Sequence, residues 1–323
     1  MLVKNWKFGG GEAMVKLPET EQFVEHFRDS VWVDAGRRIF RNNRIKISSV
    51  RRSDHGESVV LLGDDSYVMK IFNPNKRGFI RESHALELLD GELPIGVPKV
   101  AAAGQFEGYD FLITTRIPGR LITKQEWLNF EWDDQVKLLA ELADVFQTLH
   151  KIKADTMDFD WSQFVERNAV GAVERQRSEG GNPEWFESLP SFIDENLSLV
   201  PTDGPSLFLH GDVHFGNLPV VSDENGPRIS GIFDFADSLS GFHEYDFVAV
   251  GVLMIQGQGD LQREFFRRYG YPDADINEEM RRRLMMLTIL YESSSLRRYA
   301  ERLSPGAVHL PLEELEMAIW SFA

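Results

Sequence analysis

The chain divides into two parts that differ in the spacing of their apolar residues. Up to Ile117, short apolar runs alternate with polar residues and end at turn residues, a pattern typical of β-strands. The expected strands are Ile45–Val50, Ser58–Leu62, Tyr67–Phe72, Val97–Ala103 and Tyr109–Thr115, with helices over Pro18–Arg28 and Arg81–Leu89. The first part therefore predicts an antiparallel sheet with one helix inserted among its strands.

Beyond the turn Ile117-Pro118-Gly119, apolar residues mostly recur with the spacing of amphipathic helices. The expected helices are Trp132–Lys151, Trp161–Arg177, Glu184–Leu197, Tyr245–Gln256, Leu261–Tyr269, Asn277–Arg302 and Leu312–Phe322. We therefore expect an α+β fold with an antiparallel-sheet N-terminal lobe at residues 1–116 and a mostly helical C-terminal lobe at residues 117–323. Residues 1–17 contain three consecutive glycines and predict a flexible lead-in.

The composition limits the partners of the protein. The 323 residues include 35 Lys and Arg against 51 Asp and Glu, a formal net charge of −16. This balance disfavours nucleic acid, whose binding depends on neutralising phosphates, and would suit a cationic small substrate. Because the chain has no cysteine, disulfides and cysteine-ligated metals are excluded.

The apolar segments of the chain indicate where in the cell the protein is expected. The longest apolar run, Phe247–Ile255, is too short to span a bilayer, and the N-terminus shows no apolar signal segment. We therefore expect a cytoplasmic protein without a membrane partner, present as a monomer or a homodimer.

The candidate chemistry is concentrated in the stretch Leu207–Asp246. Asp212 follows a short strand, Asn217 comes five residues later, and a further strand, Ile229–Phe233, leads to Asp234. Protein kinases have the same spacing, with a catalytic aspartate, an asparagine five residues on, and an Asp-Phe-Gly that holds Mg²⁺. The pattern predicts phosphoryl transfer, with Asp212 accepting the proton of an attacking hydroxyl. Asn217 and Asp234 are the expected oxygen ligands of Mg²⁺.

Two further residues of this stretch have expected supporting roles. His210 is expected to brace the loop through hydrogen bonds rather than to act as a base. Asp237 either orients the metal ligands or faces the acceptor.

Two other functions compete with phosphoryl transfer. Gly211–His214 resembles a Gly-Asp-x-His metal loop of metallophosphoesterases, but the chain lacks the further Asp-x-His, Gly-Asn-His and Gly-His-x-His segments of a two-metal cluster. A catalytically silent, kinase-like nucleotide-binding protein is the second alternative. The presence of all the reacting residue types counts against it.

Lys70 is the candidate phosphate-binding residue of the first part. It is the one charged residue in the apolar strand Tyr67–Phe72, where an ammonium group is costly to bury unless it meets an anion. In kinase-type sites that anion is the α/β-phosphate pair, and a helix glutamate holds the lysine. Glu82, twelve residues on, is the expected partner. Alternatively, Lys70 extends to solvent from an edge strand and Glu82 only favours a helix N-terminus.

Other nucleotide contacts are less sharply indicated. Ser53–Ser58 lies where a phosphate-covering loop belongs but has one glycine instead of three, so Ser58 is either a phosphate contact or part of an ordinary hairpin. By position alone, the backbone of Thr115 and Ile117 would contact a purine edge. The sequence does not distinguish ATP from GTP as the donor.

These motifs resemble those of the aminoglycoside phosphotransferase and choline kinase family, small-molecule kinases with a protein-kinase-like bilobal fold. The matching residues are Lys70, Glu82, Leu149-His150, His210-Gly211-Asp212, Asn217, Asp234-Phe235-Ala236-Asp237, Gly241 and Tyr245-Asp246. The resemblance implies that Asp212 is the catalytic aspartate and that Asn217 and Asp234 bind Mg²⁺. It also implies that Lys70 contacts the phosphates of ATP and that Asp246 is a structural carboxylate tying the loop to the following helix.

The short distance between Asp234 and Asp246 indicates the class of acceptor. It leaves no room for the activation segment or the Ala-Pro-Glu of a protein kinase, so the acceptor is expected to be a small molecule. An aminoglycoside-type antibiotic is the leading expectation, which would make the protein an antibiotic-resistance enzyme. Choline, homoserine, a methylthio-sugar or another hydroxylated metabolite is the alternative.

Overall fold

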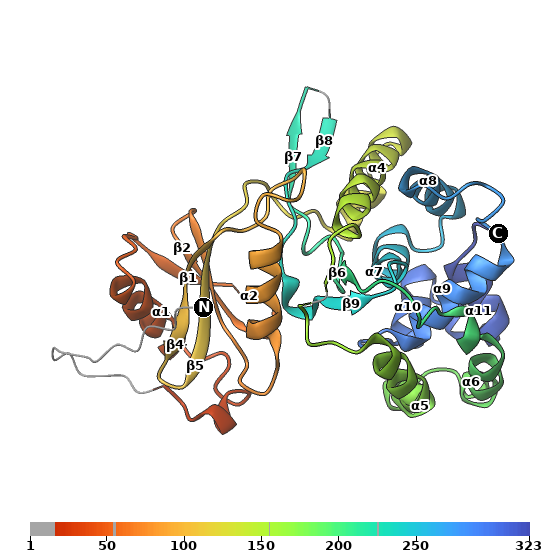
Figure 1. Ribbon diagram of the computed structural model, residues 1–323, viewed down its shortest axis with the longest axis horizontal. Coiled ribbons are helices and arrows are strands. Elements are labelled where there is room, and N and C mark those ends of the chain that lie inside the picture. The colour runs from red at the N-terminus through yellow and green to blue at the C-terminus, as the bar shows by residue number, and fades with distance from the viewer. Residues whose placement is uncertain (1–16, 54–55, 155, 225) are drawn as a thin grey trace. The chain divides into compact units, whose positions relative to one another are not determined.

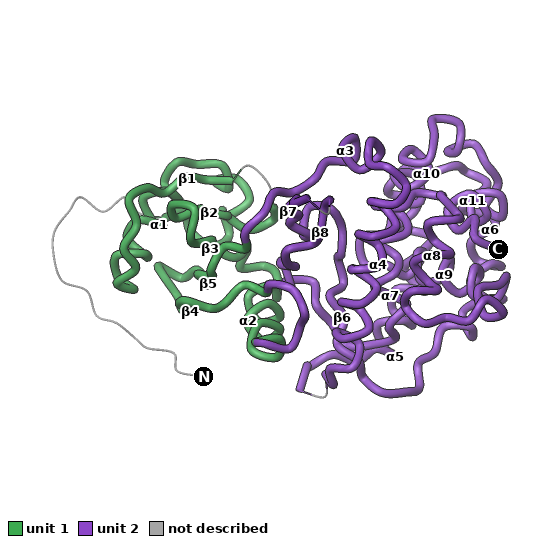
Figure 2. Tube along the Cα trace, turned by 90° about the horizontal axis from the view of Figure 1, so that it is seen from above, with its two compact units in different colours: residues 1–90, 97–117 green, residues 91–96, 118–323 purple. Residues whose placement is uncertain are grey.

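The computed structural model describes residues 17–53, 56–154, 156–224 and 226–323. The expected lead-in at residues 1–17 lies outside these ranges except for Leu17, which is buried. The chain forms two compact units, Met1–Asp90 with Val97–Ile117 and Gly91–Gly96 with Pro118–Ala323 (Figure 2). Each unit is described separately below.

The first unit contains a five-stranded antiparallel sheet, as predicted. Its strands, in spatial order, are β1 (Val50–Arg52), β2 (Val59–Gly63), β3 (Tyr67–Ile71), β5 (Tyr109–Thr115) and β4 (Val100–Phe106).

The first predicted strand was misplaced. Residues 45–49 are not a strand, because the Asp64 carboxylate accepts hydrogen bonds from the N–H groups of Ser48 and Ser49 at 2.8 to 3.1 Å. A side chain thus takes the place of a neighbouring strand there, and regular pairing begins only at Val50.

Two helices accompany this sheet. They are α1 (Val31–Asn42) and α2 (Gly78–Leu88), which lie on opposite sides of it in Figure 1. Helix α1 was not predicted, although its buried residues Trp32, Ala35 and Ile39 have helical spacing. The helix expected over Pro18–Arg28 was wrong, because only a 3₁₀ turn at Thr20–Gln22 forms there.

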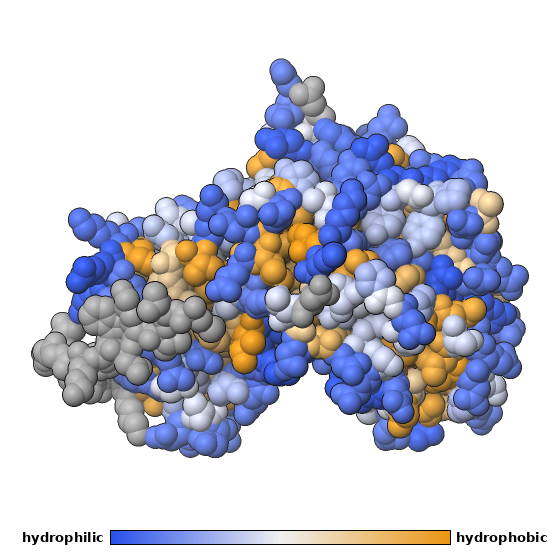
Figure 3. All heavy atoms as spheres, viewed as in Figure 1, coloured by the Kyte–Doolittle hydropathy of each residue, from blue (hydrophilic) through white to orange (hydrophobic). Residues whose placement is uncertain are grey.

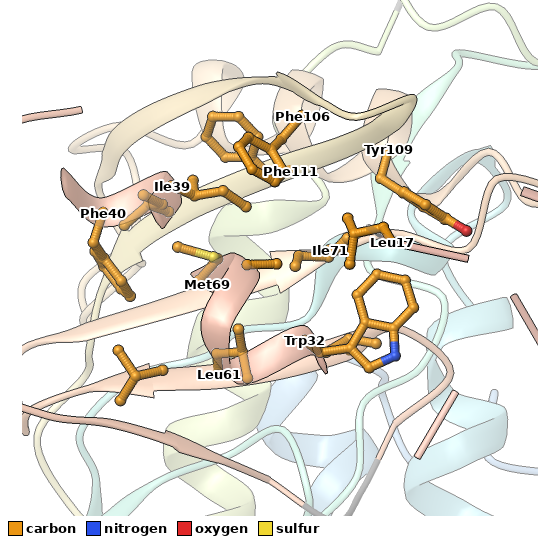
Figure 4. Packing of buried hydrophobic residues seen from close by; sticks show 14 of the residues in the cluster. Leu17, Trp32, Ile39, Phe40, Leu61, Met69, Ile71, Phe106, Tyr109 and Phe111 are labelled. Carbon is orange, nitrogen blue, oxygen red and sulfur yellow. The ribbon is translucent and has the colours of Figure 1, made fainter. Parts of the chain in front are cut away.

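The core of the first unit lies between α1 and the sheet, where apolar side chains of both elements interlock (Figure 4). Met69 and Ile71 of β3 belong to this core and are almost fully buried. Because successive strand residues point to opposite faces, Lys70 points away from the core, toward the α2 side. The alternation of β3 thus separates the packing residues from the candidate phosphate-binding residue.

The second unit is mostly helical, as predicted. Its α-helices are α3 (Lys124–Leu128), α4 (Trp132–Leu149), α5 (Trp161–Glu179), α6 (Pro183–Asn196), α7 (Tyr245–Ala249), α8 (Gly259–Tyr269), α9 (Glu278–Leu290), α10 (Leu296–Leu303) and α11 (Leu312–Ile319). Shorter 3₁₀ turns occur at η2 (Leu197–Leu199), η3 (Phe235–Asp237) and η5 (Ala307–His309), and α7 continues as a π-helix, η4 (Val250–Ile255).

Two small antiparallel sheets hold the candidate motif. They are β6 (Leu207–Leu209) with β9 (Leu239–Gly241) and β7 (Val220–Asp223) with β8 (Gly226–Ile229). The strand expected at Ile229–Phe233 is instead β8, which lies earlier in the chain and ends at Ile229.

The helix expected over Asn277–Arg302 is broken into α9 and α10. Residues 291–295 contain three consecutive serines, and serine competes with helical hydrogen bonding by bonding to nearby backbone groups. Ser295 does so as the N-cap of α10, where its side chain accepts a bond from Arg298 N at 3.3 Å. This break proves central to the candidate site.

The surface is largely polar. Hydrophilic residues dominate the face shown in Figure 3, and the hydrophobic residues there form separate groups. Within the described residues, no helix has both the length and the apolar character needed to cross a membrane.

Candidate active site

The loop that carries Asp212 is fastened to the start of α7 by a buried carboxylate. Asp246 accepts hydrogen bonds from His210 N at 2.9 Å and from Gly211 N at 2.7 Å. His150, at the end of α4, lies 3.1 Å from the same carboxylate through Nε2. An ionised carboxylate can only accept, so His150 donates from Nε2 and accepts from the Tyr269 hydroxyl, 2.9 Å away, at Nδ1. Two helices therefore fix the loop through one side chain.

His210 braces the same loop from inside. Its Nε2 lies 3.1 Å from Phe233 O and its Nδ1 lies 3.3 Å from Asp212 N, so the ring donates at Nε2 and accepts at Nδ1. Burial lowers the pKa of His210, which favours this neutral form. Both ring nitrogens are thus engaged by the backbone, in the arrangement expected of a bracing residue.

Gly211 is required by the path of the loop. Its φ is +83°, in the left-handed region, and a Cβ there would lie 2.3 Å from Asp237 O. A side chain would therefore meet both backbone strain and a backbone atom that cannot move independently.

The Asp212 carboxylate is 32% exposed and has a donor beside each oxygen. The Tyr291 hydroxyl is 3.2 Å from Oδ1, and His214 Nε2 is 3.4 Å from Oδ2. Asp212 is therefore open to a ligand while its orientation is restricted from two sides.

Asn217 and Asp234 are brought together by backbone pairing. Phe233 N donates to Asn217 O at 3.1 Å, which places the residue before Asp234 against Asn217. The β7–β8 hairpin lies between Asn217 and Asp234, so the chain enters and leaves the hairpin at the same end, as the sequence predicts. Asp234 has φ 70° and ψ 65°, a left-handed conformation that aspartate tolerates better than most residues.

These two side chains fit a magnesium ion that also binds phosphates. Asn217 Nδ2 donates to Asp212 O at 2.8 Å, which leaves the amide oxygen as the ligand atom. Amide and carboxylate oxygens suit Mg²⁺, which commonly takes one or two protein ligands and fills its octahedron with water and substrate phosphates. Across the described residues, no group of three or more His, Cys, Asp or Glu could hold a metal ion.

In the first unit, Lys70 and Glu82 form the ion pair that the sequence predicts. Lys70 Nζ lies 2.8 and 2.7 Å from the two carboxylate oxygens of Glu82, and the side chains are 13% and 4% exposed. The alternative in which Lys70 extends freely to solvent is therefore wrong. Glu82 fixes the ammonium group, which retains some exposure through which it could meet a phosphate.

The other expected nucleotide contacts are Ser58, Thr115 and Ile117. Ser58 is half-buried just before β2, in a loop whose residues 54–55 are outside the described ranges. The Thr115 N–H donates to Lys99 O at 2.9 Å and its hydroxyl accepts from Lys99 N at 3.0 Å, so the backbone donor expected at Thr115 is already used. Ile117, among the described residues, donates to no backbone carbonyl through its N–H.

The acidic residues near the site differ in their availability. Asp237 is exposed in η3. Glu244, which could have bound a cationic substrate, is fully buried and bonds to Arg283 at 2.7 and 2.8 Å and to the Tyr271 hydroxyl at 2.6 Å. Glu301 pairs with Arg297 at 3.4 Å on the surface. Glu292, next to Tyr291, is exposed.

Tyr291 was not predicted as a site residue, and His214 was predicted only as part of a possible metal loop. His214 is two residues from Asp212, so its proximity could have been anticipated. Tyr291 is 79 positions from Asp212 and lay inside a predicted helix, so the sequence held no signal for it.

A five-stranded antiparallel sheet in one unit and a mostly helical second unit are the elements of a protein-kinase-like fold. Residues 49–285 match the model of the Phosphotransferase enzyme family, and the chain belongs to that family.

One sequence relative is the probable ketoamine kinase YniA of Escherichia coli K12, 28% identical over 161 residues, or 47% of this chain and 54% of the relative. The chain thus spans about half the length of the curated relatives that it matches.

Solved structures with this fold include the GDP complex of wild-type aminoglycoside 2'-phosphotransferase-IIIa, with TM-score 0.69 and 17% identity over 90% of this chain and 98% of that one. A streptomycin–ATP complex of APH(2")-IIa has TM-score 0.59 and 19% identity over 87% of this chain and 98% of that one. At these identities the likeness concerns the fold, and it confirms the predicted protein-kinase-like α+β class.

Proposed function

We propose that this protein is a small-molecule kinase that transfers the γ-phosphate of ATP or GTP to a hydroxyl group with the help of Mg²⁺. The observation that carries the proposal is the setting of Asp212. Its carboxylate is 32% exposed, while its loop is held by Asp246 and its own carbonyl by Asn217. A general base must be open to its substrate and fixed in place, and this setting meets both requirements.

In the proposed reaction, the acceptor hydroxyl gives its proton to Asp212 while its oxygen forms a bond to the γ-phosphorus. The bond from that phosphorus to the β–γ bridging oxygen breaks, and the nucleoside diphosphate leaves with the electron pair. Base catalysis of this kind contributes about 10²- to 10⁴-fold. Bound Mg²⁺, held by Asn217 and Asp234, would supply positive charge that offsets the charge on the phosphate oxygens.

The two parts of the chain have different proposed tasks. Residues 1–116 would bind the nucleotide, with Lys70 on its phosphates and Glu82 holding Lys70 in place. Ser58 and the backbone at Ile117 are further candidate contacts. Residues 117–323 would carry the base, the metal ligands and the acceptor site.

The acceptor we favour is a hydroxylated amine. The net charge of −16 suits a cationic ligand, and an aminoglycoside remains the first candidate. A ketoamine is the second, because the sequence relative YniA carries the name of a probable ketoamine kinase. Both classes combine a hydroxyl group with an amine.

A coupled assay of ADP or GDP release tests the proposal. Mg-ATP and Mg-GTP are each offered with aminoglycosides, ketoamines, macrolides, choline, homoserine and methylthio-sugars, and the phosphorylated product is identified by mass spectrometry. We expect release with at least one hydroxylated amine. Nucleotide binding without transfer to any acceptor would instead support the catalytically silent alternative.

A further inference from the structure

Tyr291 lies in the break between α9 and α10 and reaches the candidate base. Its hydroxyl contacts the Gly211 carbonyl oxygen and lies 3.2 Å from Asp212 Oδ1. We propose that Tyr291 is a positioning residue that fixes the orientation of the Asp212 carboxylate. This inference rests on the proposed function of Asp212 as the base.

The Tyr291 hydroxyl is a reliable donor because it stays protonated. The side chain is buried, with 6% exposure, and its ring stacks on Tyr245 at a centroid distance of 5.0 Å. Burial, and then the nearby Asp212 carboxylate, raise the pKa of Tyr291 well above its ordinary value.

The hydroxyl has one proton but faces two acceptors. The Gly211 carbonyl and the ionised Asp212 carboxylate can only accept, whereas a phenol donates one bond and also accepts. While Asp212 is ionised, the Tyr291 proton is best directed at it, because bonds to charged groups are stronger.

The segment that delivers Tyr291 is itself fixed by α5. Gln176 donates to Ser294 Oγ at 3.0 Å and accepts from Leu296 N at 2.8 Å. Arg175 donates to Ile289 O at 2.7 Å, at the end of α9. Residues on both sides of Tyr291 are therefore bonded to one helix, so little reorganisation is needed when the proton moves.

His214 lies beside the other carboxylate oxygen. Its Nδ1 accepts from the Gly216 N–H at 2.9 Å, and its Nε2 lies 3.4 Å from Asp212 Oδ2. Tyr291 is thus the closer of the two side chains beside the Asp212 carboxylate, and its hydroxyl donates a hydrogen bond there.

The test compares Tyr291→Phe with Tyr245→Phe in the full chain, using the acceptor found by the release assay. Both changes remove a buried hydroxyl from the same ring stack, but the Tyr245 hydroxyl accepts from Glu292 N and does not contact Asp212. We expect Tyr291→Phe to lower kcat about tenfold or more, with both KM values within about twofold, because the hydroxyl contacts Asp212 and the carbonyl oxygen of the residue before it. Tyr245→Phe should keep kcat within about threefold of the unsubstituted protein.

Equal kcat values for the two variants would overturn the inference. Absence of ADP or GDP release by the unsubstituted protein with every acceptor would overturn the proposed function, and the inference with it. If Tyr291→Phe does not fold, p-aminophenylalanine at position 291 retains an N–H donor of weaker acidity. A kcat below that of the unsubstituted protein would then support the inference, and an unchanged kcat would refute it.

Discussion

Asp246 Oδ1 accepts a hydrogen bond from Gly211 N at 2.7 Å, although the two residues are 35 positions apart. The bond joins the first turn of α7 to the loop that carries Asp212. Because Asp246 is buried and also accepts from His210 N and His150, the position of the candidate base depends on this one carboxylate.

Replacing Asp246 with Asn should lower both stability and turnover. An amide offers one accepting oxygen instead of two and places an NH₂ group against a donor, so a buried hydrogen bond is lost. We expect a loss of about 2 to 3 kcal/mol in the free energy of unfolding, measured in urea, and at least a tenfold lower kcat. Asp144→Asn is the control, because Asp144 pairs with Arg268 on the surface, where such pairs contribute about 0 to 1 kcal/mol. Similar effects of the two changes would contradict the anchoring role.

Gly211→Ala should be far more damaging than Gly180→Ala. Both glycines have positive φ, +83° and +75°, so alanine meets similar backbone strain of about 1 to 2 kcal/mol. Only at Gly211 would the new Cβ lie 2.3 Å from a backbone oxygen, whereas at Gly180 nothing lies within 4 Å. Gly211→Ala is expected to lower kcat by at least about a hundredfold, while Gly180→Ala changes stability alone. Comparable kcat values would mean that the loop can move without loss of function.

Removing Lys70 should take from the buried Glu82 carboxylate its ion-pair partner in β3. Lys70→Met is therefore expected to destabilise the protein by about 3 kcal/mol, and the double change Lys70→Met with Glu82→Gln should regain part of that loss. Neither variant should retain the affinity of the unsubstituted protein for Mg-ATP, because the proposed phosphate contact is gone. Urea unfolding and a nucleotide titration separate the two effects. Full nucleotide affinity in Lys70→Met would refute its proposed role.

Asp212→Asn should abolish transfer while leaving nucleotide binding nearly unchanged. The amide has about the same size as the carboxylate but cannot take a proton from the acceptor, so kcat should fall by about 10²- to 10⁴-fold. Thermal shifts with Mg-ATP should match those of the unsubstituted protein. Turnover that stays within about tenfold would show that the base is wrongly assigned.

His243 should make the protein less stable in mild acid. Burial lowers the pKa of His243 to about 3, from an ordinary value of 6.5, so the unfolded chain binds this proton more readily than the folded one. Well above pH 6.5, protonation of His243 does not affect the free energy of unfolding. As the pH falls from 6.5 toward 3, its effect becomes increasingly destabilising. Between pH 7.5 and 5.5 the free energy of unfolding should fall by about 1 kcal/mol from this group. His243→Phe, which keeps an aromatic ring beside Tyr269 and Tyr271, should reduce that difference, and an unchanged pH dependence would contradict it.

Local pattern predicted the strands better than the connections between them. The apolar run at Tyr109–Thr115 located β5 without error. Local pattern failed before Val50, where Asp64 takes the hydrogen bonds that a neighbouring strand would otherwise make. The hydrophobic pattern does not indicate where a side chain, instead of a neighbouring strand, accepts the backbone hydrogen bonds.

The sequence by itself determined which residues are the candidates for the proposed reaction. The spacing of Asp212, Asn217 and Asp234 lies within one short stretch, where strands and a hairpin constrain the geometry locally. The pairing of Lys70 with Glu82 also followed from the cost of burying an ammonium group in an apolar strand.

Only the tertiary structure decided how the base is held. Tyr291 meets Asp212 because the helix predicted over Asn277–Arg302 is broken at residues 291–295 and α5 fixes the break. That contact spans 79 positions and depends on the packing of α9, α10 and α5. Periodicity describes which face of a helix is apolar, but it cannot tell which distant loop a residue at the end of that helix will meet.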